Sequence, residues 1–239
     1  MIARRYAYVW GILLLLLPGC EAPRQLVISL DTTGVQPSVE TEDLAAVLER
    51  CVDKDGFIDV DKYKDAAKTL EKQLAVMAVT GPTITPRRYP TPADKLAYWY
   101  NARTAWSVFL AMRLYQKKET NASLLSSCHI PLDGGEMTLM GIDQAIFDLG
   151  GYRAVVAAPG ADLQRAALPE TPFTPQTIRE QIHERFVAFV DDRHRFNVDI
   201  ETQEVRFPPV LWRYRKDILA ENKQLYGTPD ATFTTALLP

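Results

Sequence analysis

The clearest pattern in the chain is a long apolar segment at positions 91–115. It opens on Thr91-Pro92-Ala93-Asp94, where Thr can cap a helix, Pro suits the first helical position and an acid suits the first turn. Behind this start, apolar side chains such as Trp99, Trp106 and Leu114 fall on nearly every face of a helix. A helix that is apolar all round is buried at the centre of its domain. The sequence therefore predicts a buried central helix over about 91–115.

Shorter amphipathic segments and turn signals flank this helix. Helical spacing predicts further helices at about 41–51, 61–79, 138–148, 174–190 and 209–219. Turn residues between apolar segments predict hairpins over 130–139 and 196–207, and the apolar run 153–158 predicts a buried strand. The predicted fold class is α+β: a helix-dominated single domain around one buried central helix, with small antiparallel hairpins.

Polar side chains interrupt the central helix and its neighbours. A buried polar group needs a partner, or it costs about 1–3 kcal/mol. One interpretation is that these side chains line a pocket made of Trp99, Asn101, Arg103, Thr104, Asp143 and Arg153. The other, which we favour, is structural: Asn101 bonds a neighbouring loop, while Arg103 stacks on a tryptophan or pairs with an acid such as Asp143.

The first residues carry a separate pattern. Arg4 and Arg5 precede an apolar run at 6–17, which is shorter than the roughly 20 residues that span a bilayer. A charged head, a short apolar core and small residues before a cleavage point are typical of a secretory signal. Leu17-Pro18-Gly19-Cys20 resembles the lipobox of bacterial lipoproteins, in which the Cys receives a diacylglyceryl group and its new amine an acyl chain such as palmitate.

This resemblance implies a domain plan and a location. We expect residues 1–19 to be the signal peptide, 20–40 the lipidated N-terminus with its tether, and 41–239 a globular domain. Two or more acyl chains hold a protein stably on a bilayer, so the expected partner is a membrane of the cell envelope, with the domain facing the periplasm. Glu21 follows the Cys instead of the Asp that retains some lipoproteins at the inner membrane, which favours the outer membrane.

Composition narrows the function classes. Removing residues 1–19 takes away Arg4 and Arg5 and leaves 25 basic against 30 acidic residues. No dense basic run remains, so nucleic acid is not an expected partner. The mature chain is long enough for one domain with a sizeable core.

Cysteine and histidine are the residue types that could carry chemistry here. Besides Cys20, the chain has Cys51 and Cys128, which could form a disulfide in an oxidising compartment or remain separate buried thiols. The three histidines, His129, His183 and His194, lack metal-ligand spacing, so we expect no metal and no other cofactor. The candidates for catalysis are Cys128 as nucleophile with His129 or His183 as its base.

The order of these motifs resembles that of the domain of unknown function 547 family. The matching pieces fall within about 55–217: Asp55–Tyr63, Leu96–Ala102, Met137–Asp143, Arg153 before an apolar run, and Trp212-Arg213-Tyr214. A Cys/His set in that family suggests papain-like or transglutaminase-like chemistry.

Residue by residue, this chain keeps Trp99, Asn101 and Arg153 of the family pattern. It departs elsewhere: Arg103-Thr104 stands for Tyr-Asn, Asp143-Gln144 stands for Glu-His, and 155–161 contains neither His nor Cys. Gln cannot relay a proton as imidazole does, and no thiolate is left at the expected place. The resemblance thus implies a non-catalytic domain that binds a protein, a peptide or another envelope component. The alternative is an envelope hydrolase or acyl-transferase that uses Cys128.

Overall fold

The computed structural model describes residues 27–119, 123–162, 164–192, 195, 197–199, 204–227 and 232–233. The expected signal peptide, Cys20 and His194 therefore lie outside the described residues. The elements in chain order are α1 (Glu42–Cys51), α2 (Val60–Val79), the 3-10 turn η1 (Pro86–Arg88), α3 (Pro92–Gln116), α4 (Ser123–Ser127), β1 (Ile130–Leu132), β2 (Gly135–Met137), α5 (Leu139–Ala157), α6 (Ile178–Asp191), β3 (Asn197–Asp199), β4 (Glu204–Arg206), α7 (Pro209–Arg213) and α8 (Arg215–Tyr226).

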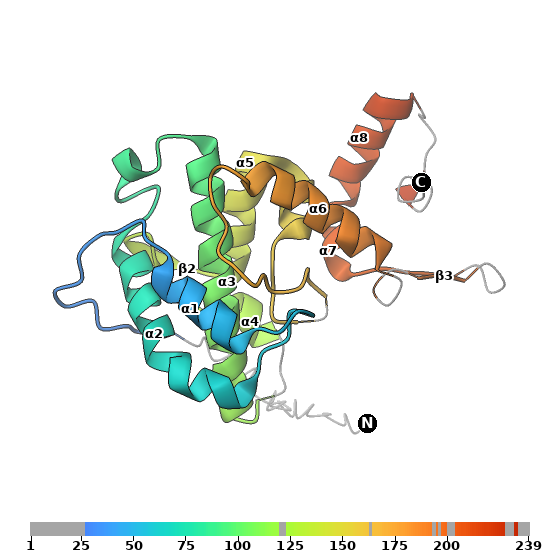
Figure 1. The fold of residues 1–239 in the computed structure, drawn as a ribbon. Coiled ribbons are helices and arrows are strands. Elements are labelled where there is room, and N and C mark those ends of the chain that lie inside the picture. Colours follow the sequence, from blue (N-terminus) through green and yellow to red (C-terminus); the bar gives the residue numbers. More distant parts are fainter. Residues whose placement is uncertain are drawn as a thin grey trace, which may run out of the picture.

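Helix α3 forms the middle of the domain, and the other helices pack around it (Figure 1). Every residue from Leu96 to Leu110 is buried. Helices α2 and α5 both contact α3, α1 packs on α2, and α6 packs on α5. On the side away from α2, α8 projects from the body (Figure 1). The structure confirms the predicted fold class, including the buried central helix.

The start of α3 follows the residue chemistry that predicted it. The Thr91 hydroxyl accepts a hydrogen bond from the Asp94 amide at 3.2 Å, and the Asp94 carboxylate accepts one from the Thr91 amide at 2.9 Å. This reciprocal capping satisfies amides that the first helical turn leaves without partners. Pro92 occupies the first turn, where a missing N–H costs nothing.

The hairpins form where turn residues predicted them. β1 pairs antiparallel with β2, and β3 pairs antiparallel with β4. The first hairpin turns at Asp133, whose φ of 52° lies in the left-handed region. The carboxylate of Asp133 is buried and accepts hydrogen bonds from the amides of Thr83 and Ile84, each at 2.9 Å. The turn therefore also fixes the loop that follows α2.

The predicted strand at 153–158 is wrong, because this segment is the last part of α5. Gly151 adopts φ 70° and ψ −172°, which interrupts the helix for one residue, and the helix then continues to Ala157. A short apolar run suits a buried helix as well as a buried strand, and periodicity alone cannot separate them.

The segment before α1 packs on the body instead of forming a free tether. Ile28 is buried, and its amide donates to the carbonyl of His129 at 2.9 Å. The Ser38 amide donates to the Thr80 hydroxyl at 3.1 Å. The described residues of the expected tether over 20–40 are thus attached to the body at Ile28 and Ser38, and the boundary at residue 40 stays a prediction. Among the described helices, none has the length and hydropathy that a membrane span requires.

Candidate functional site

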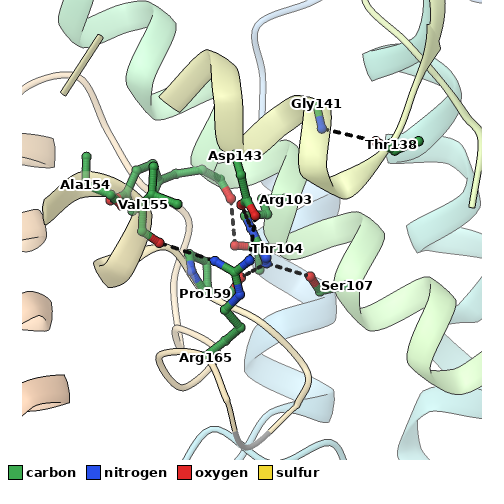
Figure 2. Close-up of polar contacts among 11 residues, drawn as sticks. Arg103, Thr104, Ser107, Thr138, Gly141, Asp143, Ala154, Val155, Pro159 and Arg165 are labelled. Carbon is green, nitrogen blue, oxygen red and sulfur yellow. Dashed lines mark hydrogen bonds and ion pairs between the residues drawn. The ribbon is translucent and has the colours of Figure 1, made fainter. Parts of the chain in front are cut away.

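Arg103 and Arg165 enclose the carboxylate of Asp143 in the core (Figure 2). Arg103 lies on α3 and places its Nε 2.6 Å from Oδ1 of Asp143, while Arg165, from the loop after α5, places Nη2 2.5 Å from Oδ2. The side chains of Arg103 and Asp143 are only 4% and 2% exposed. Arg103 also donates to the Ser107 hydroxyl and to the Pro159 carbonyl. We call Arg103, Asp143 and Arg165 the ion triad.

The triad holds Asp143 in its charged form. Burial raises the pKa of this carboxyl, but the charges and hydrogen bonds of Arg103 and Arg165 outweigh burial and leave the pKa below its usual 3.8. Both carboxylate oxygens are already bonded. Asp143 is therefore unsuited to proton transfer, and the structure confirms the structural interpretation in which Arg103 pairs with it.

The other predicted pocket residues are also bonded within the fold, and they do not converge on one site. Thr104 donates to the carbonyl of Tyr100 at 2.8 Å. Trp99 is buried and packs edge-on against Tyr98, with ring centroids 4.9 Å apart. Arg153 is 44% exposed and pairs with Glu221 at 2.9 Å.

Asn101 joins α3 to the loop before α6. Its Nδ2 donates to the carbonyl of Phe173 at 2.9 Å, and its Oδ1 accepts from the Phe173 amide at 2.7 Å. This is the loop contact that the structural interpretation of Asn101 predicted. Asn101 thereby fixes Phe173 in place, and the backbone of that loop needs no water at this point.

Arg185 of α6 holds the same loop from the other side. It donates to the carbonyls of Ala157 and Ala167, and its guanidinium lies 5.3 Å from the centroid of the Phe173 ring. Burial lowers the pKa of Arg185 to about 10, so the side chain remains a cation at neutral pH. The sequence analysis missed this residue, because nothing near position 185 indicates which carbonyls it will meet.

The described contacts of the proposed catalytic residues do not join a thiol to an imidazole. Cys128 is buried, and its Sγ lies 3.7 Å from the carbonyl oxygen of His129. The imidazole of His129 faces Glu136, with Nδ1 3.7 Å from Oε2. His183 is exposed on α6. The hydrogen bond described for the Cys128 thiol therefore goes to a backbone carbonyl, whereas an activated cysteine is bonded to an imidazole base.

Cys51 and Cys128 are both buried and are not joined by a disulfide, so the structure favours the alternative of two separate buried thiols. Burial raises the pKa of each thiol above its usual 9.0. Because the thiolate is the reactive form, such cysteines are less reactive than exposed ones.

Alkylation of the folded protein tests this assignment. In the mature chain carrying Cys20→Ser, we expect iodoacetamide at pH 7.5 to label Cys51 and Cys128 at least about tenfold more slowly than in guanidinium chloride. Mass spectrometry of the two cysteine-containing peptides gives both rates. Rapid labelling of Cys128 in the folded chain would instead support a catalytic thiol.

A cavity of about 250 Å³ opens between the segment before α1 and the loop before α6. We call its lining residues from α2 and α3 the floor, and Arg88 and Tyr89 at the end of η1 also line it. The lining residues are Ser38, Val39, Glu40, Thr41, Gln73, Met77, Thr80, Arg88, Tyr89, Asp94, Ala97, Tyr98, Asn101, Phe173, Thr174, Pro175 and Gln176. Asn101 is the one predicted pocket residue among them. The other lining residues were not predicted, because they come from five segments that only the fold brings together.

The polar groups in the floor of this cavity are bonded to the protein itself. The Tyr98 hydroxyl donates to the carbonyls of Met77 at 3.1 Å and Thr80 at 2.9 Å. Gln73 donates to the Glu40 carbonyl and accepts from the Leu44 amide, each at 3.3 Å. Both polar atoms of the Asn101 side chain are bonded to the backbone of Phe173. The floor therefore presents aromatic and aliphatic surface, on walls that these hydrogen bonds fix in place.

Another cavity, of about 340 Å³, lies beside the turn at Gly56. Its lining has a single aromatic residue, and it combines small, apolar and charged residues: Gly56, Gly160, Ala161, Ala167, Phe57, Ile58, Leu168, Asp55, Asp162 and Arg195. Ligand pockets are usually lined by aromatic and apolar side chains with a few polar groups. The cavity beside Asn101 fits that description better and is the candidate functional site.

Within the residues that the structure describes, no three His, Cys, Asp or Glu side chains converge so that they could hold a metal ion. Comparison of the chain with protein-family models, with curated proteins and with solved structures returns no match. The candidate site therefore rests on the geometry described above.

Proposed function

We propose that this chain is an exported bacterial lipoprotein, anchored through Cys20, whose domain binds a ligand without catalysing a reaction. The binding site is the cavity beside Asn101. The observation that carries the proposal is that this cavity is open to solvent, while the polar atoms of its floor are already hydrogen-bonded within the protein. Such a site can enclose an apolar group, and its lining residues include neither cysteine nor histidine.

The remaining polar chemistry supports binding over catalysis. Asp143 is locked between two guanidinium groups, and the thiols of Cys51 and Cys128 are buried with raised pKa values. In this proposal the chain is a divergent member of the domain of unknown function 547 family that has lost the family's Cys/His chemistry. Its partner is a protein, a peptide or another component of the cell envelope.

The length of chain before the body fits a membrane-anchored role. Val27 is already paired with His129, and it follows Cys20 by seven positions. A fully extended chain of that length reaches at most about 25 Å. An acylated Cys20 would thus keep the domain close to the lipid surface, which we place at the outer membrane, facing the periplasm.

A neutral fluorescent probe tests the binding site. N-phenyl-1-naphthylamine is uncharged and brightens in apolar surroundings, and we expect it to bind the mature chain carrying Cys20→Ser in buffer without detergent. Ala97→Phe adds a ring to the cavity and should weaken binding at least about tenfold, since the ring takes the space of the probe.

Two further variants keep this experiment decisive. Ala161→Phe adds the same side chain to the cavity beside Gly56 and should leave probe affinity unchanged. Val39→Trp narrows the mouth at a position that is 49% exposed, so it blocks entry with little risk to the core. Equal affinity in Ala97→Phe, Val39→Trp and the parent chain would refute the proposed site.

A further inference from the structure

The charged residues around the cavity are unequally neutralised. Asp94 lines the cavity, but its carboxylate accepts hydrogen bonds from the amide and hydroxyl of Thr91 at 2.9 and 2.5 Å. It also lies in the first turn of α3, where the helix dipole favours a negative charge. Asp94 is therefore already compensated by the fold.

Glu40 lies near a cation that it shares with Asp43. Lys72 of α2 bonds Asp43 at 2.8 Å, and its charge also interacts with that of Glu40. The backbone carbonyl of Glu40 accepts from Gln73. The negative residues at the rim thus have positive or hydrogen-bonding partners within the chain.

Arg88 is different. It lines the cavity from η1 and is exposed, and within the described part of the chain its guanidinium has neither an ion pair nor a hydrogen bond. A guanidinium presents five donors in a planar fork that matches a carboxylate, sulfonate or phosphate. The rim therefore carries a cation ready to pair with an anion from outside the protein.

The surface next to Arg88 is aromatic. Tyr89 and Tyr98 pack edge to face with ring centroids 5.1 Å apart, and both line the cavity. Phe173 also lines the cavity, and Asn101 and Arg185 hold it in place. Aromatic rings pack favourably against one another in edge-to-face or offset geometry. A cavity of 150 Å³ can hold a benzene ring, so about 250 Å³ has room for a slightly larger planar group.

We infer that the ligand of this site is an aromatic or similarly compact apolar group that carries an acidic substituent, with the apolar part between Tyr98 and Phe173 and the acid on Arg88. This inference rests on the proposed function, since it names the ligand class of the same cavity. The acid can belong to a small molecule or to the end of a peptide, because either presents the same pair of groups.

A matched pair of probes isolates the role of the acid. 8-Anilino-1-naphthalenesulfonate has the rings of N-phenyl-1-naphthylamine and adds one sulfonate. We expect the anionic probe to bind the parent chain about three- to tenfold more tightly than the neutral one, a range that allows for solvent screening at an exposed arginine. The difference should shrink as salt is raised from 20 to about 500 mM, because salt screens exposed charges.

Arg88→Gln supplies the decisive variant. This substitution should lower the affinity of the anionic probe by about three- to tenfold and leave the affinity of the neutral probe unchanged. Arg87→Gln is the matched control, because Arg87 is the adjacent exposed arginine and does not line the cavity. It should change neither affinity.

The outcomes separate the two proposals. If Ala97→Phe and Val39→Trp leave the affinity of the neutral probe unchanged, the proposed site is wrong and the proposed function fails with it. If the neutral probe binds the site but the anionic probe gains nothing, or Arg88→Gln and Arg87→Gln act alike, only the acidic ligand class is overturned. A peptide ending in Phe and its C-terminal amide, used as competitors, then distinguish the source: stronger competition by the free acid supports a peptide end, and equal weak competition supports a small aromatic acid.

Discussion

Replacing Asp143 by Asn should lower the free energy of unfolding by about 3–5 kcal/mol. The neutral amide has nearly the shape of the carboxylate, so packing changes little. What changes is that Arg103, whose side chain is 4% exposed, and Arg165, whose side chain is 12% exposed, lose the charge that compensates them. A buried charge without its counter-charge is far more costly than the ion pair is favourable.

Urea unfolding at pH 7, followed by circular dichroism, measures this effect. Asp148→Asn is the matched control, because it makes the same change on α5 at an exposed position bonded to Gln144 at 2.7 Å. The control should shift stability by less than about 0.5 kcal/mol. A loss below about 1 kcal/mol for Asp143→Asn would show that the triad is not buried and charged as described.

Asp143 also makes the stability of the folded protein depend on pH in the acid range. The pKa of Asp143 is lower in the folded protein than its usual 3.8, so the folded state binds this proton less readily than the unfolded chain. The stabilisation that charged Asp143 provides is therefore complete above the pKa of this residue in the unfolded chain. It is lost as pH falls from about 4 through the folded pKa. Unfolding curves of the parent and Asp143→Asn should converge over that acid range.

The central helix could be predicted because its signals are local. Thr91, Pro92 and Asp94 sit within one turn, and their capping role depends only on neighbours in the chain. The apolar composition of the next five turns leaves burial as the favourable outcome. The same holds for the Asp133-Gly134 turn, whose backbone conformation follows from its residue types.

The candidate site could not be predicted, because its parts are remote in sequence. Asn101 meets Phe173 across 72 positions, and Arg103 meets Asp143 across 40. The residue types on α3 indicate that each buried polar group needs a partner, and Asp143 was one predicted partner of Arg103. It could not place Arg165 or Phe173, because loop conformation is set by tertiary contacts rather than by local residue patterns.

The triad and the cavity are linked by one loop. Arg165 and Arg185 each fasten the chain between α5 and α6, and Phe173 at the end of that chain forms a wall of the cavity. Asn101 holds Phe173 directly from α3. Under the proposed function, the polar residues of the core would act on ligand binding through the position of Phe173. They need not touch the ligand themselves.

Changing Cys20 to Ala should abolish lipid attachment. Without the thiol no diacylglyceryl group can be added, and the chain should show no label when cells grow on radioactive or alkyne-tagged palmitate. The parent chain should carry the label and partition almost completely with membranes, because each buried methylene contributes about 0.8 kcal/mol and more than one chain is inserted. Cys51→Ala is the control, since that thiol is buried in the domain and should not affect labelling.

Cell fractionation tests the same prediction. It needs a variant whose signal is cleaved, because an uncleaved signal could itself hold the chain in the membrane. The chain from Glu21 onward, placed behind a cleavable secretory signal, should be recovered in the soluble periplasmic fraction, whereas the parent should stay with membranes through an alkaline wash. Loss of two or more acyl chains removes essentially all stable membrane affinity, while a single chain would leave marginal, reversible binding. Residues 27–40 contact the body of the domain, so the lipid is what this prediction requires to hold the chain on the membrane. An unlipidated chain that stayed with the membranes through the alkaline wash would contradict the prediction.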